Sequence, residues 1–169
     1  MANEIVNRVE KSGLINFDLG ELVDHNQIVE LDIKDQLFQG LILREKDFRL
    51  FIKETDWSQY EGKHVAIFCS ADAIVPTWAY MLIANKLHGV ASSFLFGSKQ
   101  ELISQTYRKV IQTLNEDDYV NKRVVIKGCG DDSVPVSAYV DITDKLRPLV
   151  RSLMFGEPCS TVPVYKKKV

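Results

Sequence analysis

The feature that most constrains the fold is an internal repeat, which relates residues 64–98 to residues 124–157. At an offset of 59, ten of the 23 paired positions from Val75 to Gly97 are identical. A repeat of this length indicates two copies of one supersecondary unit. It also places a cysteine and an aspartate at the same point in each copy.

Each copy is predicted to run strand, loop, helix and strand. The continuous apolar runs His64–Phe68 and Arg123–Ile126 are typical of strands covered on both faces, as in a parallel sheet. A Val-Pro pair then opens the helix, because proline is well accepted as the first residue of a helix. The elements predicted for the two copies are strands over residues 64–68, 90–96, 123–126 and 150–155, and helices over residues 76–88 and 135–147.

Outside the repeat, the spacing of apolar residues predicts further elements. They are strands over residues 28–33 and 161–165, and helices over residues 37–42, 44–57 and 98–114. Ser98 and Glu101 have the spacing of a capping box at the start of the last helix. The alternation of strands and helices is the signature of an α/β fold, with a mainly parallel sheet flanked by helices.

The length of 169 residues favours a single domain over residues 1–169. In it, residues 1–62 are an amino-terminal elaboration of strand and helix. Residues 158–169 form a carboxyl-terminal strand and tail. A hydrophobic content of 46% and a charged content of 26% are ordinary for a soluble globular protein.

Charge and hydropathy argue against two classes of partner. The net charge of −2 gives no electrostatic case for nucleic acid, and we interpret Lys166–Lys168 as a solvated tail. The apolar stretches are interrupted before the roughly 18 residues that a membrane-spanning helix needs, and no export signal is evident. Three cysteines are too few for a disulfide scaffold, so we expect a cytoplasmic location.

The two loops that carry cysteine and aspartate form the candidate site. Cys69 and Cys129 each follow a predicted strand and precede a predicted helix, which is where open α/β sheets bind ligands. A thiol near the start of a helix tends toward a lowered pKa, because the helix dipole stabilises the thiolate. Gly128 and Gly130 leave room for close approach to Cys129, and Cys159 follows the last strand of the second copy.

Three thiolates with a carboxylate or an external ligand suit zinc or an iron–sulfur cluster, provided that the loops converge. The competing interpretation is structural, because free cysteine is often buried as a small hydrophobe, and an aspartate can close a turn and cap a helix. The predicted metal ligands are Cys69, Cys129 and Cys159, and the predicted cofactor-binding residues are Asp72, Gly128, Gly130 and Asp132.

Other catalytic chemistries find less support. His64 lies five residues before Cys69 on one strand, about 16 Å away at its other end. His88 ends the helix that follows Cys69, about 20 Å from it, and only His25 stays unplaced. The sequence contains no Cys-x-x-Cys, no Walker motif and no Gly-x-Gly-x-x-Gly motif.

The chain resembles a family of bacterial proteins, domain-of-unknown-function family 2480 (DUF2480). The resemblance is carried by residues 69–80, 127–129 and 154–163 and covers essentially the whole chain. It implies no established activity and assigns no catalytic residues. Members of the family look to be often encoded near sulfur-mobilisation genes for iron–sulfur cluster assembly, and this setting favours the cysteine interpretation.

Three functions stay open. The preferred one is a thiolate site for metal or sulfur handling, accessory to iron–sulfur cluster assembly. The second is a small enzyme that binds an anionic substrate at the two helix amino termini, with Asp72, Asp131 or Asp132 as acid or base. The third is a non-catalytic protein-interaction module, such as a homodimer, in which the loops are structural.

Overall fold

The structure is a computed structural model that describes residues 13–127, 133–157 and 160–168. By their contacts the described residues form two compact units. The first unit takes the residues up to Val23 and those from Tyr107 onward, and the second unit is Asp24–Thr106. The single-domain organisation of the chain stays a prediction. No helix among the described residues is both long and apolar enough to cross a bilayer.

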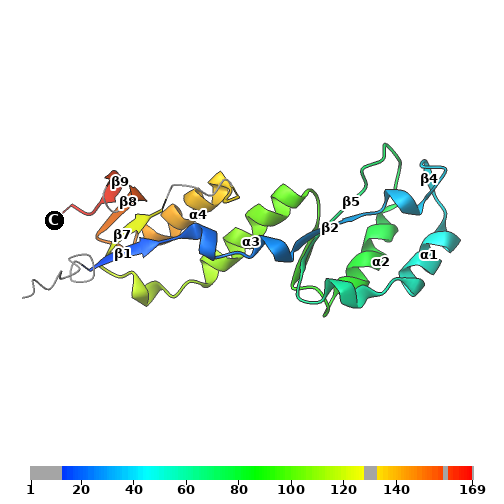
Figure 1. The fold of residues 1–169 in the computed structure, drawn as a ribbon, viewed down its shortest axis with the longest axis horizontal. Helices are drawn as coiled ribbons and strands as arrows, with labels where there is room; N and C mark the ends of the chain where they lie inside the picture. The colour runs from blue at the N-terminus through cyan, green and yellow to red at the C-terminus, as the bar shows by residue number, and fades with distance from the viewer. Residues whose placement is uncertain (1–12, 128–132, 158–159, 169) are drawn as a thin grey trace, which may run out of the picture. The chain divides into compact units, whose positions relative to one another are not determined.

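The second unit is built on three parallel strands in the order β2-β5-β6. These are β2 (Ile28–Asp32), β5 (His64–Phe68) and β6 (Ser93–Phe96), accompanied by α1 (Glu45–Glu54) and α2 (Thr77–Leu87) (Figure 1). The predicted amphipathic helix from residue 44 onward is therefore confirmed, and it buries Phe48 and Ile52, which are four residues apart on one face. Both helices pack into one apolar core with the strands.

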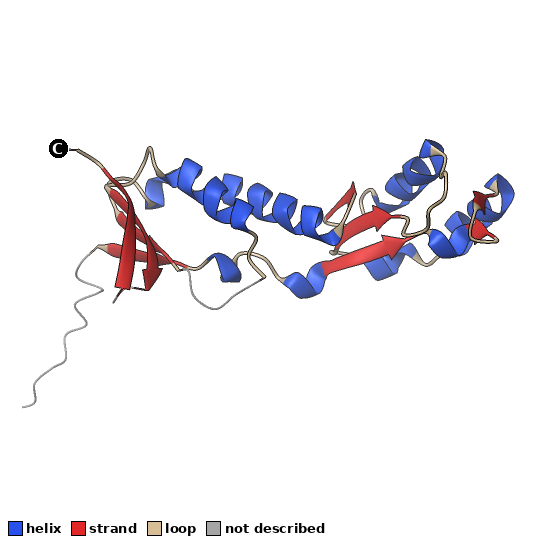
Figure 2. Cartoon of the chain, turned by 90° about the horizontal axis from the view of Figure 1, so that it is seen from above, coloured by secondary structure: helices blue, strands red, loops and turns tan. Residues whose placement is uncertain are grey.

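The first unit has a four-stranded sheet in the order β1-β7-β8-β9. Its first three strands are parallel, and β9 pairs antiparallel with β8. The strands are β1 (Leu14–Phe17), β7 (Arg123–Ile126), β8 (Ser152–Glu157) and β9 (Ser160–Lys166), and the helix between β7 and β8 is α4 (Val136–Leu146). The remaining long helix is α3 (Lys99–Thr113), drawn with the other helices in Figure 2.

The predicted α/β fold with mainly parallel strands flanked by helices is confirmed, and the parallel strands form two sheets where one was predicted. The two repeat regions have the same order of elements, and helix α4 begins and ends 59 residues after α2. Both helices bury the same stripe of side chains with no exposed surface: Ala79, Ile83 and Leu87 in α2, and Ala138, Ile142 and Leu146 in α4. That the two regions arose as a duplicated unit stays a prediction.

The helix predicted over residues 37–42 is wrong. Leu37–Phe38 and Ile42–Leu43 are instead the two strands β3 and β4 of a small antiparallel hairpin. Gln39 and Gly40 between them have positive φ angles of 52° and 71°, which suits a hairpin turn and not a helix. Single-turn 3₁₀ helices complete the described elements, at Leu19–Glu21, His25–Gln27, Lys34–Gln36, Trp57–Tyr60 and Glu116–Asp118.

The starts of the helices agree only partly with the sequence-based prediction. The capping box of α3 is confirmed, because Glu101 Oε2 accepts from Ser98 N at 2.7 Å and Ser98 Oγ accepts from Glu101 N at 3.2 Å. Pro76 and Pro135 are the N-cap residues of α2 and α4, so each helix begins one residue later than predicted. No side-chain hydrogen bond caps α2, so the competing interpretation of Asp72 as a helix cap finds no support.

Candidate functional site

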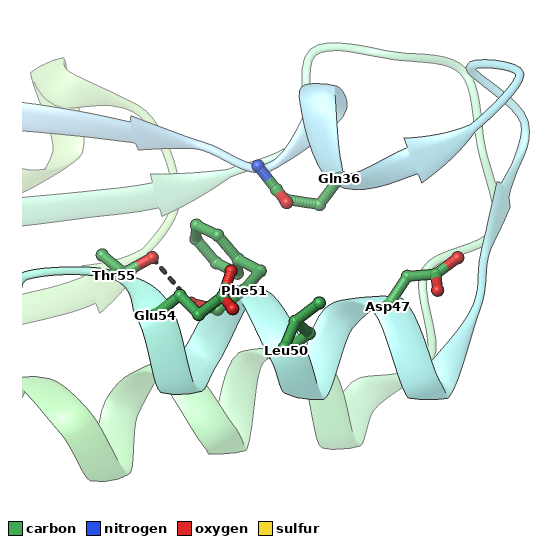
Figure 3. A pocket seen from close by; sticks show the side chains of 6 residues that line it. All are labelled: Gln36, Asp47, Leu50, Phe51, Glu54 and Thr55. Atoms are coloured by element: carbon green, nitrogen blue, oxygen red, sulfur yellow. Dashed lines mark hydrogen bonds between the residues drawn. The ribbon is translucent and has the colours of Figure 1, made fainter.

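A shallow pocket of about 380 Å³ lies beside α1 in the second unit, and no predicted site residue lines it. Asp47, Leu50 and Glu54 line it from the helix, and Gln36 lines it from the opposite side (Figure 3). Nearby, Thr55 Oγ1 donates to the Phe51 carbonyl oxygen at 2.7 Å, a bond that closes the end of α1. This pocket therefore gives no support to the prediction of a binding site at the cysteine loops.

The carboxyl edge of the β2-β5-β6 sheet brings together residues from two separate segments. Because β2 and β5 run parallel and Asp32 pairs with Phe68, the residues that directly follow β5 lie beside the end of β2. Those residues are Cys69 and Ser70. This is also the edge at which ligands bind in open parallel sheets.

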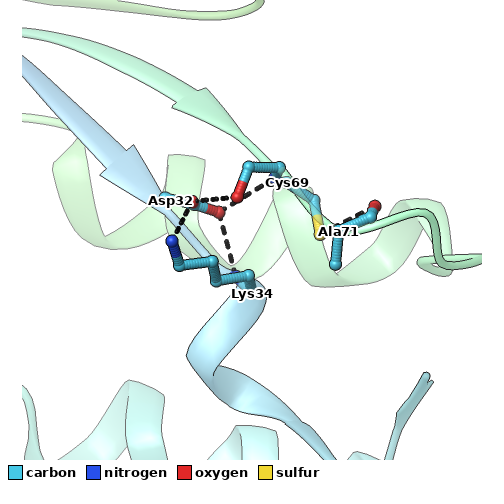
Figure 4. Close-up of polar contacts among 5 residues, drawn as sticks. Asp32, Lys34, Cys69 and Ala71 are labelled. Atoms are coloured by element: carbon cyan, nitrogen blue, oxygen red, sulfur yellow. Dashed lines mark hydrogen bonds and ion pairs between the residues drawn. The ribbon is translucent and has the colours of Figure 1, made fainter. Parts of the chain in front are cut away.

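Asp32 is the centre of the polar contacts at this edge (Figure 4). Its Oδ1 accepts from the backbone N–H groups of Ser70 and Lys34, both at 3.0 Å, and its Oδ2 accepts from Ser70 Oγ at 2.5 Å. Burial on its own raises the pKa of the Asp32 carboxyl, but these hydrogen bonds outweigh it and hold that pKa below its usual range. An ionised Asp32 thus fixes the start of the loop that carries Cys69.

Tyr80, near the start of α2, faces the same edge. Burial, and then electrostatic interaction with Cys69 and Asp32, raise the pKa of its phenol. Its ring packs edge-on against Phe96 at the end of β6, with the ring centroids 4.8 Å apart. The Tyr80 hydroxyl therefore keeps its proton at ordinary pH and is available as a hydrogen-bond donor.

The Cys69 thiol is half-buried and has two kinds of neighbour. Its Sγ lies 3.7 Å from the Ala71 carbonyl oxygen, to which it donates, and its side chain also packs against the apolar core of the second unit. Residues 70–76 separate it from Thr77, the first residue of α2, so Cys69 is not in the first turn of that helix. Asp72, in the same loop, is exposed.

The predicted metal site can be compared with the structure only in part. Within residues 13–127, 133–157 and 160–168, no three His, Cys, Asp or Glu side chains cluster so as to hold a metal ion. The other predicted site residues, Gly128, Cys129, Gly130, Asp132 and Cys159, lie outside the described residues. The metal ligands and the cofactor-binding residues therefore stay predictions.

All three histidines lie away from Cys69. His64 begins β5, at the amino edge of the sheet, and its Nδ1 is 2.7 Å from Ser93 Oγ. His25 lies in the 3₁₀ helix that precedes β2, and His88 follows the last residue of α2. These positions give Cys69 no histidine as a general base.

The carboxyl edge of the first unit carries different chemistry. Asp18, directly after β1, forms an ion pair with Lys127, directly after β7, with 2.9 Å between Oδ2 and Nζ. The hydrogen bond to Asp18 and the charge of that carboxylate raise the pKa of Lys127. Near this edge, Tyr139 packs edge-on against Phe155 with the ring centroids 5.7 Å apart.

The sequence analysis missed Asp18, Asp32, Ser70 and Lys127 as members of these edges. Asp18 and Asp32 each directly follow a short, partly apolar segment, and that position at the end of a strand was the available signal. It also missed a pocket of about 600 Å³ in the first unit, lined by Arg123, Arg151, Lys166 and Lys167 among others. The pocket was not predicted because Lys166–Lys168 were interpreted as a solvated tail.

Comparison with known proteins identifies a family but no activity. The family model described as "Protein of unknown function (DUF2480)" matches residues 3–167. No curated protein and no solved structure matches the chain. Since the family model spans nearly all of its 169 residues, the chain belongs to the DUF2480 family.

Proposed function

We propose that this protein handles sulfur or a soft metal ion through a thiolate, and that Cys69 is the functional thiol of the second unit. The observation that carries the proposal is that Cys69, the ionised Asp32 and the protonated Tyr80 meet at one carboxyl edge of a parallel sheet. Ligands of such sheets bind outside this edge. The family setting near sulfur-mobilisation genes is in keeping with a role accessory to iron–sulfur cluster assembly.

The sulfur form of the proposal is a simple exchange at one atom. The Cys69 thiolate attacks the outer sulfur of a donor persulfide, a new S–S bond forms, and the donor leaves as its thiolate. Asp32 is a positioning residue, because its hydrogen bonds to Ser70 hold the start of the loop. Tyr80 supplies a hydroxyl that can donate to the sulfur-bound negative charge.

The metal form of the proposal keeps the predicted thiolate ligands of zinc or an iron–sulfur cluster, which are Cys69 in the second unit and Cys129 and Cys159 in the first. Its support is the position of Cys69 and the sequence pattern, since thiolates are the ligands that both groups prefer. Asp72, Gly128, Gly130 and Asp132 remain the proposed residues for an anionic ligand or a cofactor beside the thiolates.

Anaerobic purification followed by two measurements tests the proposal. Elemental analysis and a visible absorption spectrum detect a bound metal or cluster, and intact-mass analysis after treatment with a low-molecular-weight persulfide detects sulfur on a cysteine. We expect one of the two signals in the native protein and its loss in Cys69→Ser. Ser58→Ala, which removes a polar side chain from an exposed 3₁₀ helix of the same unit, is the control. A protein without metal, whose Cys69 takes no sulfur, would contradict the proposal.

The interaction module is the second candidate, because equivalent positions of both units expose large apolar side chains. In the second unit Met81 and Phe96 are 66% and 67% exposed, and in the first unit Val140 and Phe155 are 63% and 38% exposed. Exposed apolar patches of this kind often mark protein–protein contacts. Light scattering after size exclusion tests for a homodimer: Met81→Lys and Val140→Lys should convert it to a monomer, and a monomeric parent protein would contradict this candidate.

A further inference from the structure

A basic pocket lies at the amino edge of the first unit's sheet. The basic pocket has a volume of about 600 Å³, and its cationic residues are Arg123, Arg151, Lys166 and Lys167. None of the described residues that line it is acidic. The volume falls within the range of about 300–1,000 Å³ that is usual for small-molecule sites.

The strand register places these cations beside one another. Arg123 of β7 pairs with Ser152 of β8, and Ser152 pairs with Lys166 of β9, so the three residues form a row across neighbouring strands. Paired residues direct their side chains to the same face of a sheet. Arg123 and Lys166 therefore flank Ser152 on one face, with Cα atoms about 10 Å apart for two strand spacings.

Backbone hydrogen bonds fix the other two cations at the edge of the same sheet. Arg151 N donates to the Lys122 carbonyl oxygen at 2.7 Å, and Lys167 N donates to the Arg151 carbonyl oxygen at 3.0 Å. The segments that carry Arg151 and Lys167 are thus held by the main chain and are continuous with β8 and β9. The basic pocket is part of the sheet framework, and Lys166 and Lys167 are not a free tail.

Three of the cations in the basic pocket have no acidic partner among the described residues. In that part of the chain, no carboxylate lies within ion-pair distance of Arg151, Lys166 or Lys167. The chain as a whole has a net charge of −2, so this concentration of positive charge is local. These three cations repel one another and are stabilised by an anion, and arginine and lysine together are the usual binders of phosphate.

One wall of the basic pocket is apolar. Met154 and Pro163, a register pair of β8 and β9, form this wall. Tyr165 pairs with the buried Leu153, so its ring lies on the opposite face of the sheet from Ser152 and Lys166, with the Arg147 guanidinium 5.2 Å from the ring centroid. A ligand of the basic pocket therefore has an anionic end and an apolar part.

We propose that the basic pocket binds a small organic phosphate with a ring, such as a nucleoside diphosphate. The cations hold its phosphates, and Met154 and Pro163 contact its ring. This site is independent of the proposed function at Cys69, which belongs to the second unit. It also differs from the anion site expected at the helix amino termini, because it lies at the amino edge of the strands.

Calorimetric titration of the full-length protein with ADP and with pyrophosphate, without added metal ions and at low ionic strength, tests the proposal. We expect both probes to bind, and we expect raised salt to weaken both, because the contacts are ionic. Arg151→Gln and Lys166→Gln should each weaken both probes by about tenfold or more. Lys109→Gln, which removes the same charge from the exposed face of α3, is the matched control and should leave binding unchanged.

The apolar wall gives the proposal a second, separate test. Met154→Ala removes most of the side chain that forms the apolar wall, so it should weaken ADP several-fold and leave pyrophosphate unchanged. The proposal is overturned if neither probe binds, if Lys109→Gln weakens binding as much as Arg151→Gln, or if Met154→Ala affects both probes equally. Binding of a single-stranded oligonucleotide in preference to ADP would also overturn it, because it would assign this surface to nucleic acid.

Discussion

The two units use the same backbone arrangement but differ at both edges of their sheets. At the amino edge, His64 and Ser93 of the second unit form a side-chain hydrogen bond, whereas the equivalent Arg123 and Ser152 of the first unit line the basic pocket. The first unit also has β9, which adds Lys166 to that row. Where the second unit has a hydrogen-bonded pair of side chains, the first unit has a candidate anion site. A few different side chains and one extra strand account for this difference.

The carboxyl edges differ in a similar way. Asp32 and Asp18 stand at equivalent ends of β2 and β1, but Asp32 binds the loop residue Ser70, whereas Asp18 pairs with the Lys127 side chain. At the amino ends of the strands the backbone is equivalent, since Ser92 N donates to the Lys63 carbonyl oxygen as Arg151 N does to that of Lys122. Function in such folds resides in the side chains at strand ends, and the shared framework only positions them.

The largest expected effect tests whether the helices of the two units contribute equivalent cores. Leu87 of α2 and Leu146 of α4 are both completely buried at equivalent positions. Leu87→Ala and Leu146→Ala should each destabilise the protein by about 3–5 kcal/mol, because each removes buried methyl groups and leaves a cavity. Urea unfolding followed by far-UV circular dichroism measures both.

The control for that comparison is Leu50→Ala, at an exposed position of α1, which should cost far less. If Leu87→Ala or Leu146→Ala lowered the free energy of unfolding by less than about 1 kcal/mol, the two cores would not be equivalent. Two separate unfolding transitions, with each variant shifting only one of them, would sharpen it by assigning each core to its own cooperative unit.

A smaller effect is expected where the two carboxyl edges differ. Asp32→Asn removes a charged acceptor of three hydrogen bonds from the loop of Cys69, so we expect a loss of stability of about 1–2 kcal/mol. The same variant should increase the rate of Cys69 alkylation a few-fold, because a loosened loop exposes the thiol more often. Peptide-resolved mass spectrometry measures that rate.

Asp56→Asn is the control for Asp32→Asn, since Asp56 accepts similar local bonds from Ser58 in an exposed turn of the same unit. It should leave the alkylation rate of Cys69 as it is. Equal effects of Asp32→Asn and Asp56→Asn on that rate would contradict the positioning role of Asp32.

The smallest expected effects are in the pH dependence of stability, which should differ between the carboxyl edges of the two units. The pKa of Asp32 is lowered in the folded protein, so its contribution is present above its ordinary value of 3.8 and is lost as the pH falls through the lower folded pKa. The pKa of Lys127 is raised, so its contribution is present below 10.5 and is lost as the pH rises through the higher folded pKa. Asp32→Asn should therefore flatten the acid limb of the stability profile, and Lys127→Gln the alkaline limb.

Melting temperatures measured at closely spaced pH values, for both variants and the parent protein, test this assignment. Asp24, Asp56 and Glu101 also have lowered pKa values, so the parent profile keeps part of its acid limb in either variant. A change of the acid limb in Lys127→Gln, with none in Asp32→Asn, would contradict the assignment.

The sequence predicted the framework well where the signal was local or repeated. The repeat and the apolar runs located α2, α4, β5 and β7 to within a residue or two, and the Ser98–Glu101 spacing located the start of α3. The hairpin of β3 and β4 was missed, because apolar residues on both sides of Gly40 mimic one helical face. Positive φ angles at Gln39 and Gly40 are not encoded by periodicity.

The site residues were harder to predict, because strand pairing decides them. Asp32 and Ser70 are 38 residues apart, and only the parallel register of β2 and β5 brings them into contact. In the same way, Arg123 and Lys166 become neighbours only through β8. Cysteine spacing could suggest a thiol at a strand end, but a single sequence holds no signal for the register that surrounds it.

The most direct test of the account is the reactivity of Cys69 in the native protein, resolved by peptide mass spectrometry under anaerobic conditions. Treatment with a persulfide donor, with and without denaturant, compares the folded and the unfolded thiol. We predict that native Cys69 acquires one sulfur atom at least as fast as the same residue in the unfolded chain, and that Asp32→Asn changes this rate. A Cys69 that reacts only after unfolding would show that it is a packing residue and would contradict the account.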